Sequence, residues 1–308
     1  MRIGINGTGL VQKASIEAIV EDAQRAKDSG FQSYHLAEHP TGGLDALTVL
    51  TIVGTRVPDI QLGTAIIPTM PRHPMVLAGQ AMTTQQAIGE RLTLGIGLSH
   101  AVMMQDLGIG FDKPIRHLKE YLSVLMPLIH EGQVDFQGET ISCRAQTFKN
   151  ATTPCTVLVA ALGPQALAVT GRMADGTTLA WVGPRTIREH IYPSINESAA
   201  KHNRPTPQIV ATLPVCVTSQ EDSIRSRISK TLGMYIQLPS YQAMFEREGV
   251  SEPGELALVG EEAKVQSSIA ELKEAGVTEF IPTTFVTNGE ERERTWALLK
   301  QINAELAA

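Results

Sequence analysis

Two histidines stand directly after apolar runs typical of β-strands, where a side chain that transfers protons would meet a bound molecule. Glu38-His39 follows the run Phe31–Ala37, and His100 follows the run Leu92–Leu98. Histidine changes its charge near neutral pH, so each could act as a general acid or base. His39 could equally donate a hydrogen bond to a bound ring, or simply hold the loop that follows it. We see no further ligands at a metal-binding spacing near this pair, and we predict no metal site.

A second kind of chemistry is indicated by Gly163-Pro164-Gln165-Ala166, which begins a predicted helix soon after the apolar run Cys155–Ala160. Exposed backbone N–H groups at a helix N-terminus, together with the helix dipole, favour a phosphate. Proline at a helix start is also common in ordinary tight turns, so the pattern leaves both interpretations open. The G-x-G-x-x-G pattern of dinucleotide-binding folds is absent here, and Gly7-Thr8-Gly9 is too sparse to replace it.

Apolar and flexible side chains stand at the same predicted strand ends and would line a broad pocket for a small-molecule substrate. They are Met70, Met103, Met104, Trp181 and Val182. For any single one of them, ordinary packing beneath the helices is the alternative. Arg72 and His73 lie between two prolines at a predicted helix start. They could meet an anionic group, or they could cap and solvate the loop.

These residues fall on an alternation of apolar runs and amphipathic helices that continues through the chain of 308 residues. In the stretch Ile60–Met104, two apolar runs flank one amphipathic helix, which is the pattern of a parallel βαβ unit. Eight such strands predict a single (β/α)8 TIM-barrel domain over residues 1–308, with a doubly wound open sheet as the alternative. In a TIM barrel, the C-terminal strand ends carry the active site, and the residues above stand at such ends.

Two segments depart from the alternation. Residues 131–151 alternate polar and apolar side chains and are predicted to form a small hairpin outside the barrel. Residues 235–256 are less regular and rich in aromatic side chains, and we expect a capping insertion there. Pro127 lies within the apolar stripe of the predicted helix Pro114–His130 and is expected to bend or end it.

Composition narrows the class of protein. The chain has 43% hydrophobic and 19% charged residues, which is typical of a soluble globular protein. A net charge of −6 with scattered basic residues argues against nucleic-acid binding. No apolar run reaches the length of a membrane span. Three cysteines without metal-type spacing, and an N-terminus that begins with a strand, predict a cytoplasmic protein without disulfides.

Four segments, in this order, resemble the bacterial luciferase-like monooxygenase superfamily, and within it the branch that uses the deazaflavin coenzyme F420. They are Leu62-Gly63-Thr64 with Pro68 and Arg72-His73-Pro74; Arg91-Leu92-Thr93-Leu94-Gly95-Ile96-Gly97; Ala160-Ala161-Leu162-Gly163-Pro164 with Gly171 and Ala174-Asp175-Gly176; and Gly276-Val277-Thr278-Glu279-Phe280. The resemblance covers nearly the whole chain and implies a TIM barrel with a flavin-like cofactor at the C-terminal face of its strands.

The resemblance also implies which residues hold that cofactor. The phosphate would bind at the turn from Leu162 through Gly163, Pro164 and Gln165 to Ala166. Glu38 and His39 would contact the deazaflavin edge, and Gly97 and Leu98 would lie beside the ring. Related F420 enzymes have a non-prolyl cis peptide bond behind the ring, which by position falls at Ala65–Ile66.

The implied reaction is hydride transfer between the deazaflavin C5 and a small organic substrate, either as reduction of C=N, C=C or C=O or in reverse. His100 falls where sugar-phosphate dehydrogenases of the group carry a catalytic Glu and methylenetetrahydromethanopterin reductases carry Asp, so the substrate stays open. His39 and His100 are the predicted catalytic residues, and Met70, Met103 and Trp181 the predicted substrate pocket. The alternatives are an FMN-dependent two-component monooxygenase and a non-catalytic flavin- or deazaflavin-binding protein.

Relatives in this superfamily often dimerise through outer helices of the barrel. The apolar predicted helices Leu44–Val57 and Met75–Ile88 could form such a homodimer here.

Overall fold

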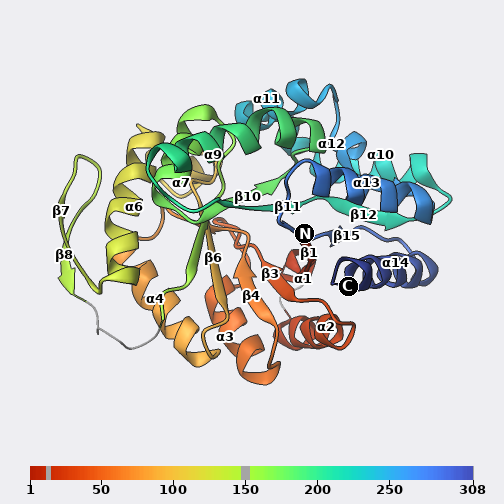
Figure 1. Cartoon of the computed structure of the whole chain (residues 1–308), viewed down its shortest axis with the longest axis horizontal. Coiled ribbons are helices and arrows are strands. Elements are labelled where there is room, and N and C mark those ends of the chain that lie inside the picture. The colour runs from red at the N-terminus through yellow and green to blue at the C-terminus, as the bar shows by residue number, and fades with distance from the viewer. Residues whose placement is uncertain (12–14, 147–152, 308) are drawn as a thin grey trace.

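A closed barrel of parallel strands forms the centre of the computed structural model, which describes residues 1–11, 15–146 and 153–307 (Figure 1). Around the barrel the segments are β1 (Arg2–Ile3) with β2 (Ile5–Asn6), β3 (Ser33–Leu36), β4 (Gln61–Thr64) with β5 (Ile67–Pro68), β6 (Leu92–Gly97), β9 (Thr156–Val159), β10 (Gly176–Ala180), β11 (Gln208–Thr212) and β14 (Glu279–Phe280). Within the described residues these segments make eight strands, because β1 and β2 belong to one strand and β4 and β5 to another. Since β1 pairs with β14 and β2 with β3, the ring closes. The predicted TIM barrel is confirmed, and the open sheet is wrong.

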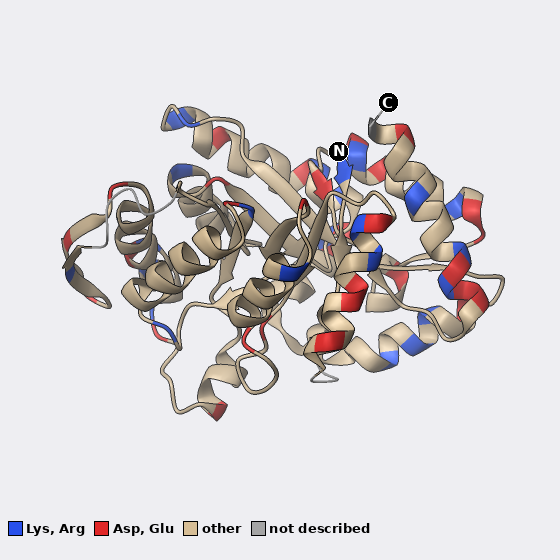
Figure 2. Ribbon diagram, turned by 90° about the horizontal axis from the view of Figure 1, so that it is seen from below, with Lys and Arg blue, Asp and Glu red and all other residues tan. Residues whose placement is uncertain are grey.

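Helices cover the outside of this ring. They are α2 (Ile16–Asp28), α3 (Ala46–Arg56), α4 (Pro74–Ala87), α6 (Pro114–His130), α7 (Pro164–Met173), α9 (Tyr192–Lys201), α10 (Glu221–Leu232), α13 (Glu262–Glu274) and α14 (Gly289–Ala307). Side chains cap the N-termini of α2 and α3. Ser15 Oγ accepts a hydrogen bond from Ala18 N at 3.3 Å, and Asp45 Oδ1 accepts one from Thr48 N at 2.8 Å. Pro127 does not end α6, which continues to His130. Charges of both signs lie along the helix that ends at the C-terminus (Figure 2).

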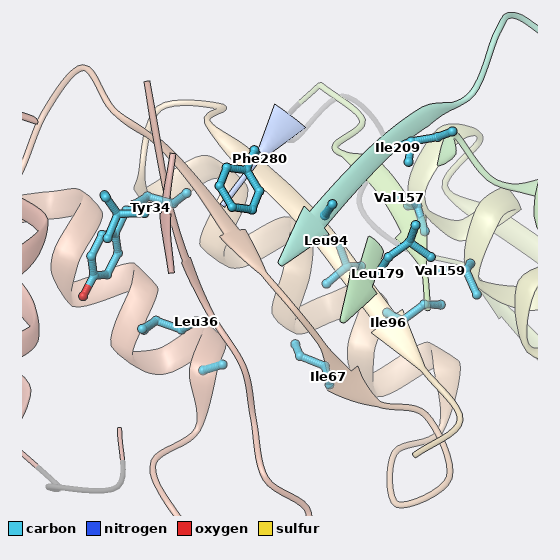
Figure 3. Close-up of a cluster of buried hydrophobic side chains, with 14 of the residues drawn as sticks. Tyr34, Leu36, Ile67, Leu94, Ile96, Val157, Val159, Leu179, Ile209 and Phe280 are labelled. Atoms are coloured by element: carbon cyan, nitrogen blue, oxygen red, sulfur yellow. The ribbon is translucent and has the colours of Figure 1, made fainter. Parts of the chain in front are cut away.

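The hydrophobic core lies between the barrel and these helices. Figure 3 shows aliphatic side chains from neighbouring strands in one layer, and each of them is buried: Leu94, Ile96, Val157, Val159, Leu179 and Ile209. Every residue of β3 and of β6 is buried, including those that alternate with the core side chains and point into the barrel. Burial on both faces explains why these strands appear in the sequence as short apolar runs rather than as alternating patterns.

The predicted hairpin is formed by β7 (Gln133–Gln137) and β8 (Ser142–Gln146), which pair antiparallel and project beyond α6 at one edge of the molecule (Figure 1). Residues 147–151 of that prediction lie outside the described residues. Glu120 of α6 fixes the hairpin turn, because its carboxylate accepts hydrogen bonds from Thr140 N at 2.6 Å and Ile141 N at 3.0 Å. Burial would raise the pKa of Glu120, but the hydrogen bonds from Thr140 and its neighbours lower it to about 2.

A smaller sheet extends the barrel beyond its seventh and eighth strands. The seventh strand continues through Leu213 into β12 (Pro214–Val217), and the eighth continues into β15 (Thr283–Thr284), which pairs with β12. The other edge of β12 pairs with β13 (Leu258–Gly260), a strand that we did not predict. Between α10 and β13, the aromatic segment folds as η2 (Gly233–Gln237), α11 (Pro239–Glu248) and α12 (Pro253–Leu256).

One carboxylate is buried inside the barrel near the N-terminal ends of the strands. Glu279 is 1% exposed, and its Oε2 accepts a hydrogen bond from Arg2 Nη2 at 2.7 Å. Its Oε1 accepts a hydrogen bond from Ser33 Oγ and lies 3.5 Å from Nε2 of His35. Burial would raise the pKa of Glu279, but the hydrogen bond and charge of His35, with Arg2 and Ser33, hold it at about 2.

Candidate active site

The third strand contains a β-bulge at the predicted position. Between the paired residues Gly63–Thr93 and Ile67–Ile96, the β4–β5 strand advances four residues while β6 advances three. The extra residue lies where the Ala65–Ile66 peptide bond is cis, so the bond expected from the resemblance is confirmed. Bulges are common beside active sites, where they redirect side chains.

Glycines in β6 make room for this bulge. A Cβ at Gly95 would collide with the carbonyl oxygen of Thr64, and a Cβ at Gly97 would lie 3.1 Å from both Ile66 Cδ1 and Ala160 Cβ. Thr64 Oγ1 also bridges the bulge, since it accepts a hydrogen bond from Gly95 N at 2.8 Å. These two glycines therefore accommodate the bulge, and the expected position of Gly97 beside the cofactor ring stays a prediction.

The loop after β3 is joined to the bulge by backbone hydrogen bonds. Ala65 N donates to Leu36 O at 2.8 Å, and Glu38 N donates to Ile66 O at 2.9 Å. Because these two bonds lie on either side of the cis peptide, they hold Glu38 beside Ala65 and Ile66. The structure thus brings together three residues that the sequence separates by nearly a whole βα unit.

Arg72 is held between two carboxylates. Its Nη1 donates to Glu38 Oε1 at 2.5 Å and its Nη2 donates to Asp45 Oδ2 at 2.5 Å. The second oxygen of Glu38 accepts a hydrogen bond from Ala46 N at 3.2 Å, at the start of α3. Of the two roles that the sequence left open for Arg72, these pairs favour the structural one, because its charge is already balanced.

The two predicted catalytic histidines lie on the loops after β3 and β6, the strands that flank the third strand of the barrel. His39 is exposed, and His100 is half-buried at the N-terminus of α5 (Ala101–Asp106). Burial lowers the pKa of His100 below 6.5, and the nearby charge of His39 lowers it further. At neutral pH the His100 imidazole is therefore uncharged and can accept a proton.

Aromatic side chains from a distant part of the chain surround His100. Its ring centroid lies 5.7 Å from that of Tyr241 in α11 and 6.4 Å from that of Tyr235 in η2. Tyr235 in turn contacts Trp181, which follows β10, at 5.4 Å. The sequence indicated that residues 235–256 are aromatic, but it gave no signal that these two tyrosines contact His100 and Trp181.

The residues of the predicted apolar rim differ in how far they are buried. Met70 and Trp181 are half-buried at their strand ends, and so is Leu98, which the resemblance places beside the cofactor ring. Met103 is 7% exposed, and Ser99 Oγ lies 3.7 Å from its sulfur. Other members of the rim are almost fully buried, which favours ordinary packing for them; they are Met104 and Val182, at 0% and 1% exposure.

The predicted phosphate turn begins α7 without help from a side chain. Gly163 is the N-cap residue, and no described side chain hydrogen-bonds to the first N–H groups of this helix. Pro164 and Gln165 are exposed, and Ala166 is buried. By contrast, the next helical segment is capped, because the Glu248 carboxylate accepts from Arg185 N at 3.1 Å and Thr186 N at 2.7 Å. The free N–H groups of α7 fit a phosphate.

A buried histidine that we did not predict supports this turn. His190 is 8% exposed in η1 (Ile187–Ile191), a π-helical turn that follows α8 (Pro184–Thr186). Its Nε2 lies 2.8 Å from the carbonyl oxygen of Leu162, and because a carbonyl only accepts, Nε2 carries the proton. π-Helical turns occur frequently at functional sites. A single histidine within a helical pattern gives no sequence signal for this contact.

The family model of the luciferase-like monooxygenases matches residues 3–279, and the chain belongs to that family. A 5,10-methylenetetrahydromethanopterin reductase of Archaeoglobus fulgidus is 26% identical over 233 residues, which cover 74% of this chain and 68% of the relative. An F420-dependent glucose-6-phosphate dehydrogenase of Nakamurella multipartita is 24% identical over 259 residues, which cover 80% and 75%.

Solved structures share the fold. The coenzyme F420-dependent tetrahydromethanopterin reductase of Methanopyrus kandleri matches with a TM-score of 0.81 at 20% identity, over 97% of both chains. An F420-dependent secondary alcohol dehydrogenase matches with a TM-score of 0.82 at 16% identity, over 98% of this chain and 97% of that one.

No helix in the described ranges is long and apolar enough to cross a membrane.

Proposed function

We propose that this protein is an F420-dependent oxidoreductase that transfers a hydride between the deazaflavin C5 and a small organic substrate. The observation that supports this most directly is the order β9-β6-β4-β3 in the barrel. These four neighbouring strands end, in turn, at the uncapped phosphate turn, at His100, at the bulge and at Glu38-His39. Three of the four proteins named above carry F420 dependence in their names, and the residues of this row fit such a cofactor.

In this proposal, bound F420 supplies the carbon that gives or takes the hydride. The N–H groups of Gln165 and Ala166 hold its phosphate, and the Ala65–Ile66 bulge backs its ring. His39 orients the edge of the ring or relays a proton, and His100 exchanges a proton with the substrate. Side chains from η2 and α11 cover His100 and limit the access of water. Positioning and exclusion of water are the contributions that a protein makes to cofactor chemistry of this kind.

Titration of the purified protein with F420 and with FMN tests the proposed cofactor. We expect saturable binding of F420 and at least tenfold weaker binding of FMN, measured by equilibrium dialysis. Tight FMN binding without F420 binding would instead favour the two-component monooxygenase. F420 binding without oxidation of the reduced coenzyme by any member of a panel of imines, enones and ketones would favour a binding protein without turnover.

His190 provides a second test, because it acts on the phosphate turn only through Leu162 O. We expect His190→Ala to weaken F420 binding about tenfold, since one hydrogen bond that fixes the turn is lost. Binding of the deazaflavin FO, which lacks the phosphate chain, should change less than twofold. Equal weakening of both ligands would contradict a positioning role at the phosphate turn, and His190→Gln, which can still donate, should recover most of the affinity.

We further propose a single-domain cytoplasmic protein that forms a homodimer through α3 and α4. The outer face of α4 includes Val76, which is 56% exposed and apolar. Light scattering that gives the mass of one chain at micromolar concentration would rule out the dimer.

A further inference from the structure

Four rings from three distant segments form a contact group that we name the aromatic cluster: His100, Trp181, Tyr235 and Tyr241. Besides the contacts of His100 described above, the ring centroids of Tyr235 and Tyr241 lie 5.1 Å apart with the planes at 80°. Edge-to-face contacts at such distances are favourable between aromatic rings. Each of the four side chains remains partly exposed, so the cluster presents ring surface that the protein itself does not cover.

The cluster lies next to the proposed phosphate turn. His100 follows β6 and Trp181 follows β10, and in the barrel these two strands flank β9, which leads into the turn. Ser99 and Trp181 both have positive φ, +62° and +59°, a conformation that is uncommon for residues other than glycine. Tyr235 in η2 and Tyr241 in α11, two elements that follow α10 in the chain, contact the rings at these strand ends. A substrate that reaches a coenzyme held by this turn would therefore meet these rings.

At neutral pH the cluster carries no charge. Burial raises the pKa of Tyr235 and of Tyr241, so both phenols stay protonated, and His100 is uncharged as described above. The guanidinium of Arg72, which follows the third strand, is paired with Glu38 and Asp45 and is not free to bind an anion. Placing a phosphate or carboxylate against such rings would cost desolvation energy without a compensating cation.

From these contacts, and resting on the function proposed above, we propose that the site takes an uncharged substrate whose C=O or conjugated C=C bond is attached to a flat apolar ring. In the reductive direction, that bond accepts a hydride from reduced F420 and a proton from solvent relayed through His100. The substrate gains the two electrons that the coenzyme loses. The aromatic cluster would pack against the ring of the substrate, which distinguishes this substrate class from a sugar phosphate.

The test uses two phenyl ketones that differ in charge: acetophenone, which is neutral, and phenylglyoxylate, which is anionic. Each is titrated calorimetrically into the protein, alone and after saturation with F420. We expect acetophenone to bind at least ten times more tightly. Tyr235→Leu should weaken acetophenone binding three- to tenfold, whereas Tyr192→Leu, at an exposed tyrosine of α9, should leave it unchanged.

Equal or tighter binding of phenylglyoxylate would overturn the proposal, and so would the absence of binding by both ketones or an unchanged affinity in Tyr235→Leu. Failure of F420 to bind, with the preference for acetophenone retained, would instead contradict the proposed cofactor and leave the assigned substrate class intact.

Discussion

Replacing His100 with alanine is expected to lower kcat by about 100- to 10,000-fold, the usual contribution of a positioned acid or base. The affinity for F420 should change less than twofold, because the proposed phosphate contacts come from α7. Of the aromatic cluster, His100 is the side chain whose ordinary pKa, 6.5, lies nearest to neutral pH. The rate is followed as oxidation of reduced F420 by a substrate identified in the panel.

The pH dependence of the rate, measured in each direction of the reaction, tests the role of His100 more sharply. Because burial and the charge of His39 lower the pKa of His100, its basic form predominates at and above pH 6.5. In the direction that oxidises the substrate, His100 accepts the proton, so the rate should rise with pH through an apparent pKa below 6.5 and then level off. In the reductive direction, where the imidazolium is needed, the rate should fall with pH over the same range. His100→Ala should flatten both profiles.

Two further histidines serve as comparisons. His39→Ala removes the exposed neighbour, so it should shift the apparent pKa of His100 upward and lower the rate by a smaller factor. His130→Ala, at the exposed end of α6, should leave rate and profile unchanged. A His100→Ala protein with the full rate and an unchanged profile would remove His100 from the mechanism.

Local sequence patterns were sufficient to predict the barrel strands, but not the short strand β13. The burial and the length of these strands explain the difference. Apolar runs such as those of β6 and β9 are buried on both faces, so their composition alone marks them as parallel strands. β13 is only three residues long, and its pairing with β12 joins segments about 40 residues apart. A run of that length has no recognisable period, and its assignment depends on tertiary contact.

Features of the candidate site that lie within one loop were predicted, and contacts between several loops were not. The helix start before α7 follows from a local pattern, and the cis bond at Ala65–Ile66 was expected by position from the family resemblance. The contact of Tyr235 with His100 joins residues separated by most of the second half of the barrel, and no spacing rule encodes it. Arg72 shows the same limit, since its two carboxylate partners lie on a different βα unit.

Replacing Glu279 with glutamine is expected to destabilise the fold by about 3 kcal/mol or more at neutral pH, because it removes one partner from a buried ion-pair network. Glutamine keeps the shape of the side chain but leaves Arg2 and the buried His35 without the carboxylate that they now share. Glu274→Gln, at an exposed position of α13, should change stability by no more than about 0.5 kcal/mol. Denaturant unfolding monitored by circular dichroism measures both variants.

Acid titration of stability distinguishes this network from simple packing. The pKa of Glu279 is lowered from 4.5 to about 2 in the folded protein, so its contribution is complete above pH 4.5 and is lost as the pH falls toward 2. The difference in stability between the wild type and Glu279→Gln should therefore narrow across that window, whereas a packing defect would persist. Glu279 lies near the N-terminal strand ends, whereas F420 is proposed to bind at the opposite face of the barrel. The variant should therefore keep its affinity for F420. A constant difference from pH 7 to pH 3 would show that the charge of Glu279 does not stabilise the barrel.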